Sequence, residues 1–212
     1  QKSNTDQNFN VINAELNSLS SILGNDTLNK NTLEKTMNNI GNLEKAIGSV
    51  LGETILAPID SNQYHSLNNT YWRNDLKNNS SSKLPEGAIP IISKIEKNSI
   101  LDIALVGVGI VKDQETAYKL QKDLSFGQAL TTSKGGLWRW DGFVQPQGVQ
   151  NSYSERLQQI ARVRLLQKKL PTLKKEQDVI ESKISKNQLN LRQCKLKILN
   201  LEAELSKITV DL

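Results

Sequence analysis

An apolar repeat in the last third of the chain constrains its fold more than any other feature. From Val163 onward, steps of alternately three and four residues meet mostly apolar side chains. The positions reached are Leu166, Leu170, Leu173, Gln177, Ile180, Ile184, Asn187, Leu191, Cys194, Ile198, Leu201, Leu205, Ile208 and Leu212. A repeat of about 3.5 residues held over this length predicts a long helix that supercoils with another helix. Pro171 lacks an N–H and its ring clashes with the carbonyl of Gln167, so we expect a kink or break there.

A shorter stripe with the same spacing opens the chain and ends at the turn signal Gly24-Asn25-Asp26. Its members are Phe9, Ile12, Leu16, Leu19 and Leu23. Pairing the two ends gives an antiparallel coiled coil that brackets a central block. The expected organisation is a coiled-coil segment over 1–25, a domain over 26–152 and a second coiled-coil segment over 153–212. The short first stripe leaves residues 184–212 for another molecule or for a missing upstream arm.

The central block has the pattern of a mixed α/β domain. Residues 43–51 have helical spacing and stop at Gly52, and residues 113–120 form a short helix with Asp113 as its N-cap. The polar residues 61–83 predict a loop, and a turn follows at Leu84-Pro85-Glu86-Gly87.

Strand signals follow in the second half of the block. Residues 89–95 and 100–111 are rich in β-branched side chains, and we expect a buried strand within 102–112, with a helical start left open. Residues 129–132 and 137–140 predict a β-hairpin around the turn 133–136.

Composition bounds the compartment and the class of protein. The net charge is +5, and the single Cys194 excludes an internal disulfide and fits a reducing cytosol. The sequence has no secretory signal and no apolar run of membrane-spanning length. Because it begins at Gln1, we expect a piece of a longer, cytoplasmic protein.

The motifs of catalysis, cofactor binding and metal binding are not assembled in this sequence. Gly107-Val-Gly109 lacks the third glycine of a dinucleotide fingerprint, and close approach of backbones explains this pair better. His65 is the only histidine, and Cys194 falls on the apolar seam of the last helix. We therefore expect no catalytic residue, no metal site, no cofactor and no enzyme activity.

A basic segment covers the start of the long helix. It holds seven positive side chains and no acidic one between its ends. They are Arg156, Arg162, Arg164, Lys168, Lys169, Lys174 and Lys175. Two interpretations stay open from the residues alone: a solvated helix face, or a surface that contacts nucleic-acid phosphates.

Trp138-Arg139-Trp140 also has two interpretations. In a strand the two indoles share one face and Arg139 takes the other. The indoles then fill the small core or an interface, or they form a stacking platform for single-stranded nucleic acid with Arg139 near a phosphate.

Several stretches resemble the hinge domain of bacterial SMC (structural maintenance of chromosomes) proteins. Residues 43–52, Leu56-Ala-Pro58 and Tyr71-Trp72 resemble the start of that domain. Residues 127–143 resemble its end, with a Trp-Arg-Trp-Asp-Gly motif of the alphaproteobacterial branch at 138–142. The chain departs from many family members where a Gly-Gly pair follows the hairpin, since only Gly142 and Gly148 stand there.

The resemblance implies a mixed α+β hinge of two sub-domains that forms a homodimer and is flanked by antiparallel coiled-coil helices. It further implies a cytoplasmic, nucleoid-associated role in chromosome condensation and segregation, with ATPase heads and the sites of other subunits elsewhere in a longer chain. In this family the basic surface near the coil junction contacts DNA, often single-stranded, and this favours the phosphate interpretation of the basic segment.

For the dimer contact we expect the glycines and strand residues of two stretches, 105–111 and 129–142. The residues are Leu105, Gly107, Gly109, Val111, Leu130, Gly135, Gly136, Trp138, Trp140 and Gly142. Two alternatives remain. A coiled-coil scaffold without a nucleic-acid role would dimerise through its heptads, and a small enzyme would need a polar pocket that these residues do not supply.

Overall fold

The computed structural model describes residues 2–24, 31–37, 39–60, 70–77 and 83–210. The chain divides into two compact units. The two-helix unit comprises Gln1–Ser18 with Leu165–Leu212, and the α/β unit comprises Leu19–Arg164. His65 and most of the polar stretch 61–83 lie outside the described residues. Within the described ranges, no helix is long and apolar enough to cross a membrane.

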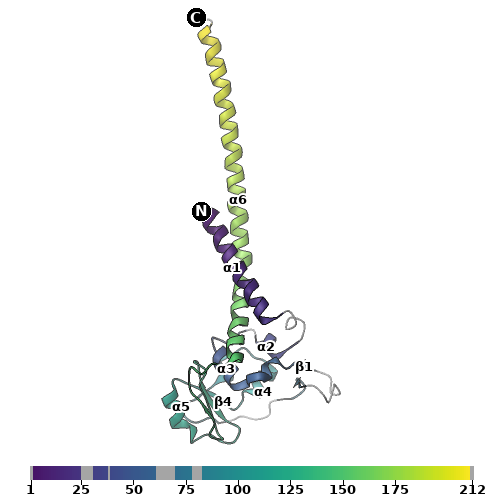
Figure 1. Cartoon of the computed structure of the whole chain (residues 1–212), viewed down its shortest axis with the longest axis vertical. Helices are drawn as coiled ribbons and strands as arrows, with labels where there is room; N and C mark the ends of the chain where they lie inside the picture. The colour runs from purple at the N-terminus through teal and green to yellow at the C-terminus, as the bar shows by residue number, and fades with distance from the viewer. Residues whose placement is uncertain (1, 25–30, 38, 61–69, 78–82, 211–212) are drawn as a thin grey trace. The chain divides into compact units, whose positions relative to one another are not determined.

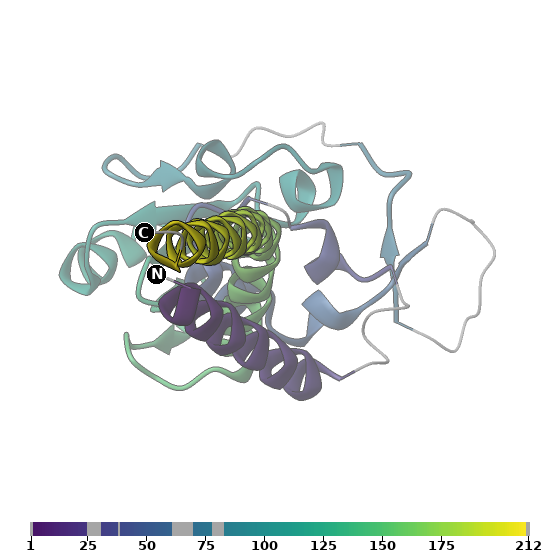
Figure 2. The same cartoon turned by 90° about the horizontal axis from the view of Figure 1, so that it is seen from above.

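The two-helix unit is built from helix α1 (Lys2–Leu23) and helix α6 (Ser152–Val210), which lie side by side in Figures 1 and 2. Gln177 Nε2 donates a 2.7 Å hydrogen bond to Asp6 Oδ1, and Val11 and Ile12 lie with Leu165 and Leu173 around one groove. Asp6 of α1 contacts Gln177, whereas Val11 and Ile12, later in α1, lie beside Leu165 and Leu173, earlier in α6. The contacts run in opposite directions along the two helices, which confirms the antiparallel pairing. Gln177 is a polar residue in the apolar seam, and it is hydrogen-bonded to a polar side chain of the other helix.

Helix α6 continues through Pro171, so of the predicted kink or break the break is wrong, and the kink stays a prediction. The proline removes one backbone hydrogen bond, but α1 packs against α6 on both sides of it, because shared grooves with α1 reach from Leu165 to Ile180. Farther along, seam residues such as Leu191, Ile198 and Leu201 are 54–61% exposed. That these distal seam positions pair with another molecule or with a missing upstream arm stays a prediction.

A five-stranded sheet forms the frame of the α/β unit, in the order β3-β4-β5-β6-β7. Strands β4 and β5 are parallel and are connected through helix α5, while the other neighbours are antiparallel. The elements are β3 (Ile89–Pro90), β4 (Val108–Val111), α5 (Gln114–Gln121), β5 (Ala129–Thr132), β6 (Leu137–Arg139) and β7 (Val144–Gln145). The predicted hairpin is β5–β6, with Leu130 opposite Trp138.

Short helices and a two-stranded parallel sheet complete the unit. They are α2 (Leu33–Thr36), α3 (Glu44–Leu51), 3-10 helix η2 (Gly52–Leu56), β1 (Ile59–Asp60), β2 (Trp72–Arg73), 3-10 helix η3 (Ile91–Lys94) and α4 (Ser99–Ala104). Helix α3 ends at Gly52 with a φ of 54°, as its sequence predicts. Asn98 caps α4 by accepting hydrogen bonds from the backbone of Ile100 and Leu101, and Asp113 caps α5 by accepting from Thr116.

Two apolar cores hold the α/β unit together. The larger contains Leu33, Ile47, Ile55 and Leu101 and also Leu157 from the start of α6. The smaller contains Val111, Ala117, Leu130 and Trp138. The two sub-domains that the resemblance implies stay a prediction, since residues 19–164 form one compact unit.

The stretch 102–112 takes the helical start that the sequence left open, because α4 ends at Ala104 and the strand begins only at Val108. The prediction that Trp138 and Trp140 share a strand face is wrong. Strand β6 ends at Arg139, so Trp138 is fully buried whereas Trp140, in the following turn, is 41% exposed.

Candidate functional site

The residues predicted for a dimer contact lie on the neighbouring strands β4, β5 and β6 and in the turns beside them. Most of them are buried within the chain itself: Leu105, Leu130 and Trp138 have no exposed surface. Trp140 and Gly142 are exposed. Whether the set forms a dimer contact stays a prediction, and the exposed members are those that a second molecule can reach directly.

The glycines of β4 and of the turn before it permit close packing inside the sheet. A Cβ added at Gly107 would lie 3.0 Å from the carbonyl oxygen of Gly127. One added at Gly109 would lie 3.0 Å from Ala88 Cβ and 3.1 Å from Leu130 Cδ2. The expectation that this pair serves close approach of neighbouring chain segments is confirmed.

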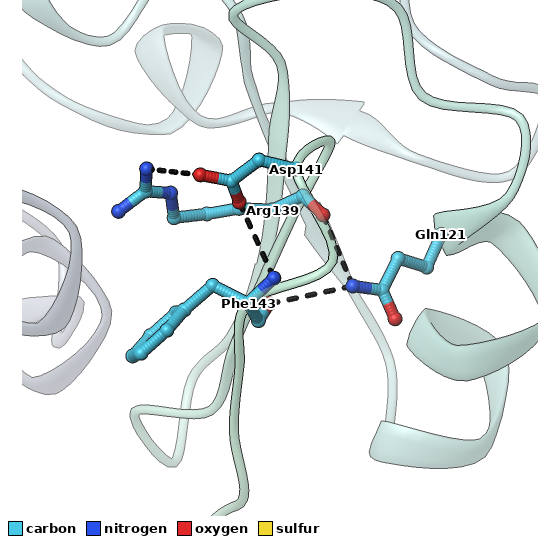
Figure 3. A network of polar contacts seen from close by, with 4 residues as sticks. All are labelled: Gln121, Arg139, Asp141 and Phe143. Carbon is cyan, nitrogen blue, oxygen red and sulfur yellow. Dashed lines mark hydrogen bonds and ion pairs between the residues drawn. The ribbon is translucent and has the colours of Figure 1, made fainter.

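The turn between β6 and β7 is held in one conformation by a polar network (Figure 3). Gln121 Nε2, at the end of α5, donates to the carbonyls of Arg139 (3.0 Å) and Phe143 (3.3 Å). The Asp141 carboxylate accepts from Phe143 N at 3.2 Å and pairs with the Arg139 guanidinium. Gly142 has a φ of 88°, a conformation that favours glycine. The turn is therefore fixed from both ends.

This turn and the loop between α5 and β5 expose aromatic side chains to solvent. Phe126 is 85% exposed and Phe143 48% exposed, and the rings of Phe126 and Trp140 lie 4.4 Å apart between centroids. The Arg139 guanidinium lies 5.5 Å from the centroid of the Phe143 ring. We call Phe126, Trp140 and Phe143 the aromatic cluster: Phe126 and Trp140 are in ring contact, and Phe143 lies in the same turn between β6 and β7 as Trp140. Phe126 and Phe143 are not among the site residues predicted from the sequence. The only sequence signal for them is their position beside turn residues.

All seven residues of the basic segment lie on α6, but they divide into two groups by environment. In the first, Arg156 donates to the Glu34 carboxylate from Nε at 2.7 Å and from Nη2 at 3.0 Å. The hydrogen bonds to Glu34 raise the pKa of Arg156, so this guanidinium stays charged. Arg156 is thus bound to the α/β unit's own buried carboxylate.

Arg164 is bound in a similar way, but to backbone carbonyls. Its guanidinium donates to the carbonyls of Lys35 (2.8 Å), Glu34 (3.2 Å) and Met37, at the end of helix α2. Burial lowers the pKa of Arg164. A cation at a helix C-terminus satisfies carbonyls that have no partner within the helix.

The other group is exposed on α6. It comprises Arg162, Lys168, Lys169, Lys174 and Lys175. Both interpretations of the basic segment, a solvated face or a phosphate contact, stay predictions. Arg156 and Arg164 fix the start of α6, and the other five cations are exposed on its surface.

The start of α6 is also packed closely on α3. A Cβ at Gly48 would lie only 2.5 Å from the Cα of Ser154. Ser154 Oγ donates to the carbonyl of Lys45 at 3.0 Å, and Ser49 Oγ donates to the carbonyl of Gly135 at 2.8 Å. Hydrogen bonds thus connect α3 both to the first turn of α6 and to the β5–β6 turn.

The described residues offer little for chemistry. Among them, no group of three or more histidine, cysteine, aspartate and glutamate side chains could hold a metal ion. A cavity of about 270 Å³ lies beside Glu34 and Arg164, whose polar atoms are already occupied by the contacts above. The α/β unit therefore offers exposed surfaces for contacts and holds the start of α6 by hydrogen bonds and an ion pair.

Comparison with known proteins gives related sequences and one related fold. No family model matches the chain. The chain is 32% identical over 120 residues, 57% of its length, to the chromosome partition protein Smc of Rhodopseudomonas palustris (strain ATCC BAA-98 / CGA009). It is 29% identical over 128 residues, 60% of its length, to the protein of the same name from Cereibacter sphaeroides (strain ATCC 17029 / ATH 2.4.9). The chain spans only about a tenth of the length of these relatives, 10% and 11%.

The related fold is that of a crystal structure of an asymmetric dimer of the Geobacillus stearothermophilus SMC hinge domain. The TM-score is 0.55 at 14% sequence identity, and the match covers 91% of this chain and 93% of the other. At this identity the match shows the fold, and it extends over both the α/β unit and the flanking helices.

Proposed function

We propose that this chain, which carries the hinge domain of a bacterial SMC protein with its adjoining coiled-coil segments, joins two copies of a longer protein at the tips of their arms. The observation that carries the proposal is the order of the parts. An α/β unit with the hinge fold is inserted between two helices that pair antiparallel, so one arm leaves the domain and returns to it. The related sequences are named as chromosome partition proteins, and chromosome partition is the process we assign.

The test of this proposal is the oligomeric state. We expect light scattering to give a dimer for the whole chain and for a version ending at residue 183, which lacks the distal part of α6. A dimer that disappears on this truncation would support the alternative, a coiled-coil scaffold held together by its heptads. A whole chain that stays monomeric would contradict both interpretations.

The proposal extends to DNA through the exposed group of the basic segment. Arg162, Lys168, Lys169, Lys174 and Lys175 are placed on the surface of one helix, without an acidic residue between Arg156 and Lys175. Phosphate contacts of this kind give weak, sequence-independent binding that falls steeply with salt. Arg156 and Arg164 stabilise the start of α6 and are not assigned to the DNA contact, because their guanidinium groups are engaged within the α/β unit.

Fluorescence anisotropy with labelled single-stranded and double-stranded oligonucleotides tests the DNA contact. We expect the charge reversals K168E and K169E together to weaken binding at low salt for both forms. Unchanged binding would remove this segment from the proposal while leaving the dimerisation function in place.

The remaining parts of the proposal concern the longer protein. In that protein, ATPase heads and the sites for other subunits lie outside this chain, and the hinge itself carries no catalytic step or cofactor. The setting is the nucleoid in the cytoplasm. A measurable ATPase activity of this chain alone would contradict the assignment of ATP hydrolysis to head domains outside it.

A further inference from the structure

We propose that the aromatic cluster of Phe126, Trp140 and Phe143 is an anchor for a second copy of this chain. The inference rests on the proposed function and deepens it, by naming side chains through which the hinge recognises its partner. Four observations lead to it: the exposure of the cluster, its rigid support, its charge and its position beside the edge strand β7.

The exposure of these rings needs an explanation. Phe126 is 85% exposed, Phe143 48% and Trp140 41%, and Phe126 and Trp140 are in ring contact at 4.4 Å between centroids. Single exposed apolar residues are common on protein surfaces, but two exposed aromatic rings in contact, with a third exposed ring in the same turn, indicate an interaction site. Aromatic residues and arginine are also the residue types that supply most of the binding energy at protein interfaces.

The cluster is held ready for binding. Gln121 fixes the backbone of Arg139 and Phe143, and Asp141 fixes the backbone N–H of Phe143 (Figure 3). Trp140 N donates a 3.1 Å hydrogen bond to the carbonyl of Gln128. A surface that is already ordered loses little conformational entropy when a partner binds, so its interactions contribute more fully to affinity.

The charge of the surface selects the class of partner. Residues 121–126 and 139–143 carry two positive and two negative side chains, and Arg139 is paired with Asp141. A nucleic acid would find no surplus of positive charge here, although phosphate contacts dominate its affinity. A neutral aromatic surface that contains its own ion pair is complementary to itself, which a contact between two identical patches requires.

The position of the cluster favours the same partner. Phe143 directly precedes β7, the last strand of the sheet, whose far side pairs with no other strand in the described part of the chain. A second copy seated on the cluster would lie along this edge. An interface of standard size buries about 800 Å² on each partner, so the aromatic side chains act as its anchors and the strand edge supplies further area.

The experiment measures dimer dissociation by sedimentation equilibrium, using the whole chain and two variants, F126A and F143A. We expect each variant to raise the dissociation constant at least tenfold, while far-UV circular dichroism and the melting temperature stay those of the wild type. L76A is the matched control, because Leu76 is an apolar side chain of similar exposure (47%) in the same unit, and it should leave the constant unchanged.

Trp140 supplies an independent readout. Its emission should shift to shorter wavelength as the chain dimerises on concentration, and W140F should abolish that shift while the dimer persists. A wild-type dimer that F126A and F143A leave intact would overturn the aromatic anchor and leave the hinge function standing, whereas a wild-type chain that is monomeric throughout would overturn both. Emission that responds to oligothymidylate but not to protein concentration would overturn the second copy as occupant in favour of nucleic acid.

Discussion

The Arg156 guanidinium and the Glu34 carboxylate form a two-point ion pair between residues 122 positions apart in the sequence. Nε lies 2.7 Å from Oε2 and Nη2 lies 3.0 Å from Oε1. The Glu34 side chain is 1% exposed and that of Arg156 20% exposed. The pair thereby attaches the beginning of α6 to α2, inside the α/β unit.

Removing Arg156 should destabilise this unit strongly. R156A leaves the Glu34 charge buried and unpaired, which costs about 3–5 kcal/mol of unfolding free energy. Replacing both residues by methionine should restore most of that stability, since an apolar pair needs no desolvation of charge. Urea unfolding measures all three variants. K169A, at an exposed position of the same helix, should change stability by no more than about 0.5 kcal/mol, and an equally small effect of R156A would refute the argument.

Gly48 should be irreplaceable for a different reason. Alanine is favoured over glycine in a helix by about 1 kcal/mol, but a methyl group at this position of α3 would meet the backbone of Ser154 at 2.5 Å. Forcing apart two packed helices costs about 1–3 kcal/mol, so the clash outweighs the propensity. We expect G48A to lower stability in thermal and urea unfolding, whereas E53A, at an exposed position, should be nearly neutral. A stabilised G48A would show that α3 and α6 are farther apart.

Local patterns in the sequence were sufficient for much of the fold. The apolar spacing of α1, α3 and α6, the Asp113 cap of α5 and the β5–β6 hairpin depend on residues close in sequence, and all are confirmed. The exposure of the Trp140 side chain could not be predicted from such local patterns. It depends on the strand ending one residue earlier, at a turn fixed by Gln121 from another element.

The candidate site was predicted less well, because its decisive partners are distant in sequence. Arg156 and Arg164 belong to a continuous basic run, and nothing near them reveals that Glu34 and the carbonyls of α2 are their acceptors. The exposure of Phe126 likewise depends on which elements cover the sheet edge. Such interactions are set by tertiary packing, which a periodic pattern does not encode.

The division of the basic segment predicts two different phenotypes. Alanine at Lys168, Lys169, Lys174 and Lys175 together should weaken DNA binding and flatten its salt dependence, by about 0.7 in the log–log slope for each phosphate of a single strand that is no longer neutralised. Anisotropy titrations at several salt concentrations measure that slope, and stability should change little because these side chains are exposed. R164Q should do the reverse, lowering the melting temperature while leaving the slope near that of the wild type. Equal salt slopes for the lysine variant and the wild type would contradict the assignment.

Asp113 should make the stability of the chain depend on pH at the acidic end. The backbone hydrogen bond from Thr116 lowers the pKa of this carboxyl in the folded chain. A lowered folded pKa means that the ionised group stabilises the fold above the unfolded value, near 3.9, and that this contribution disappears as the pH falls through the folded value. D113N keeps a capping oxygen without the charge, so melting curves should separate wild type from variant at about pH 6 and converge once the pH falls below the folded pKa. A difference that is constant from about pH 6 to about pH 2 would exclude the charge as its source.

Pro171 should limit the stability of the two-helix unit. Helix α6 passes through it without the hydrogen bond to the Gln167 carbonyl, and a proline inside a helix costs about 3 kcal/mol. P171A restores the N–H and removes the ring clash, so the helical signal at 222 nm should melt at a higher temperature. T172A, at the adjacent exposed position, isolates propensity alone and should gain at most about 0.7 kcal/mol. If P171A gains no more than T172A, packing against α1 already absorbs the cost of the proline, and the continuity of α6 needs no other stabilisation.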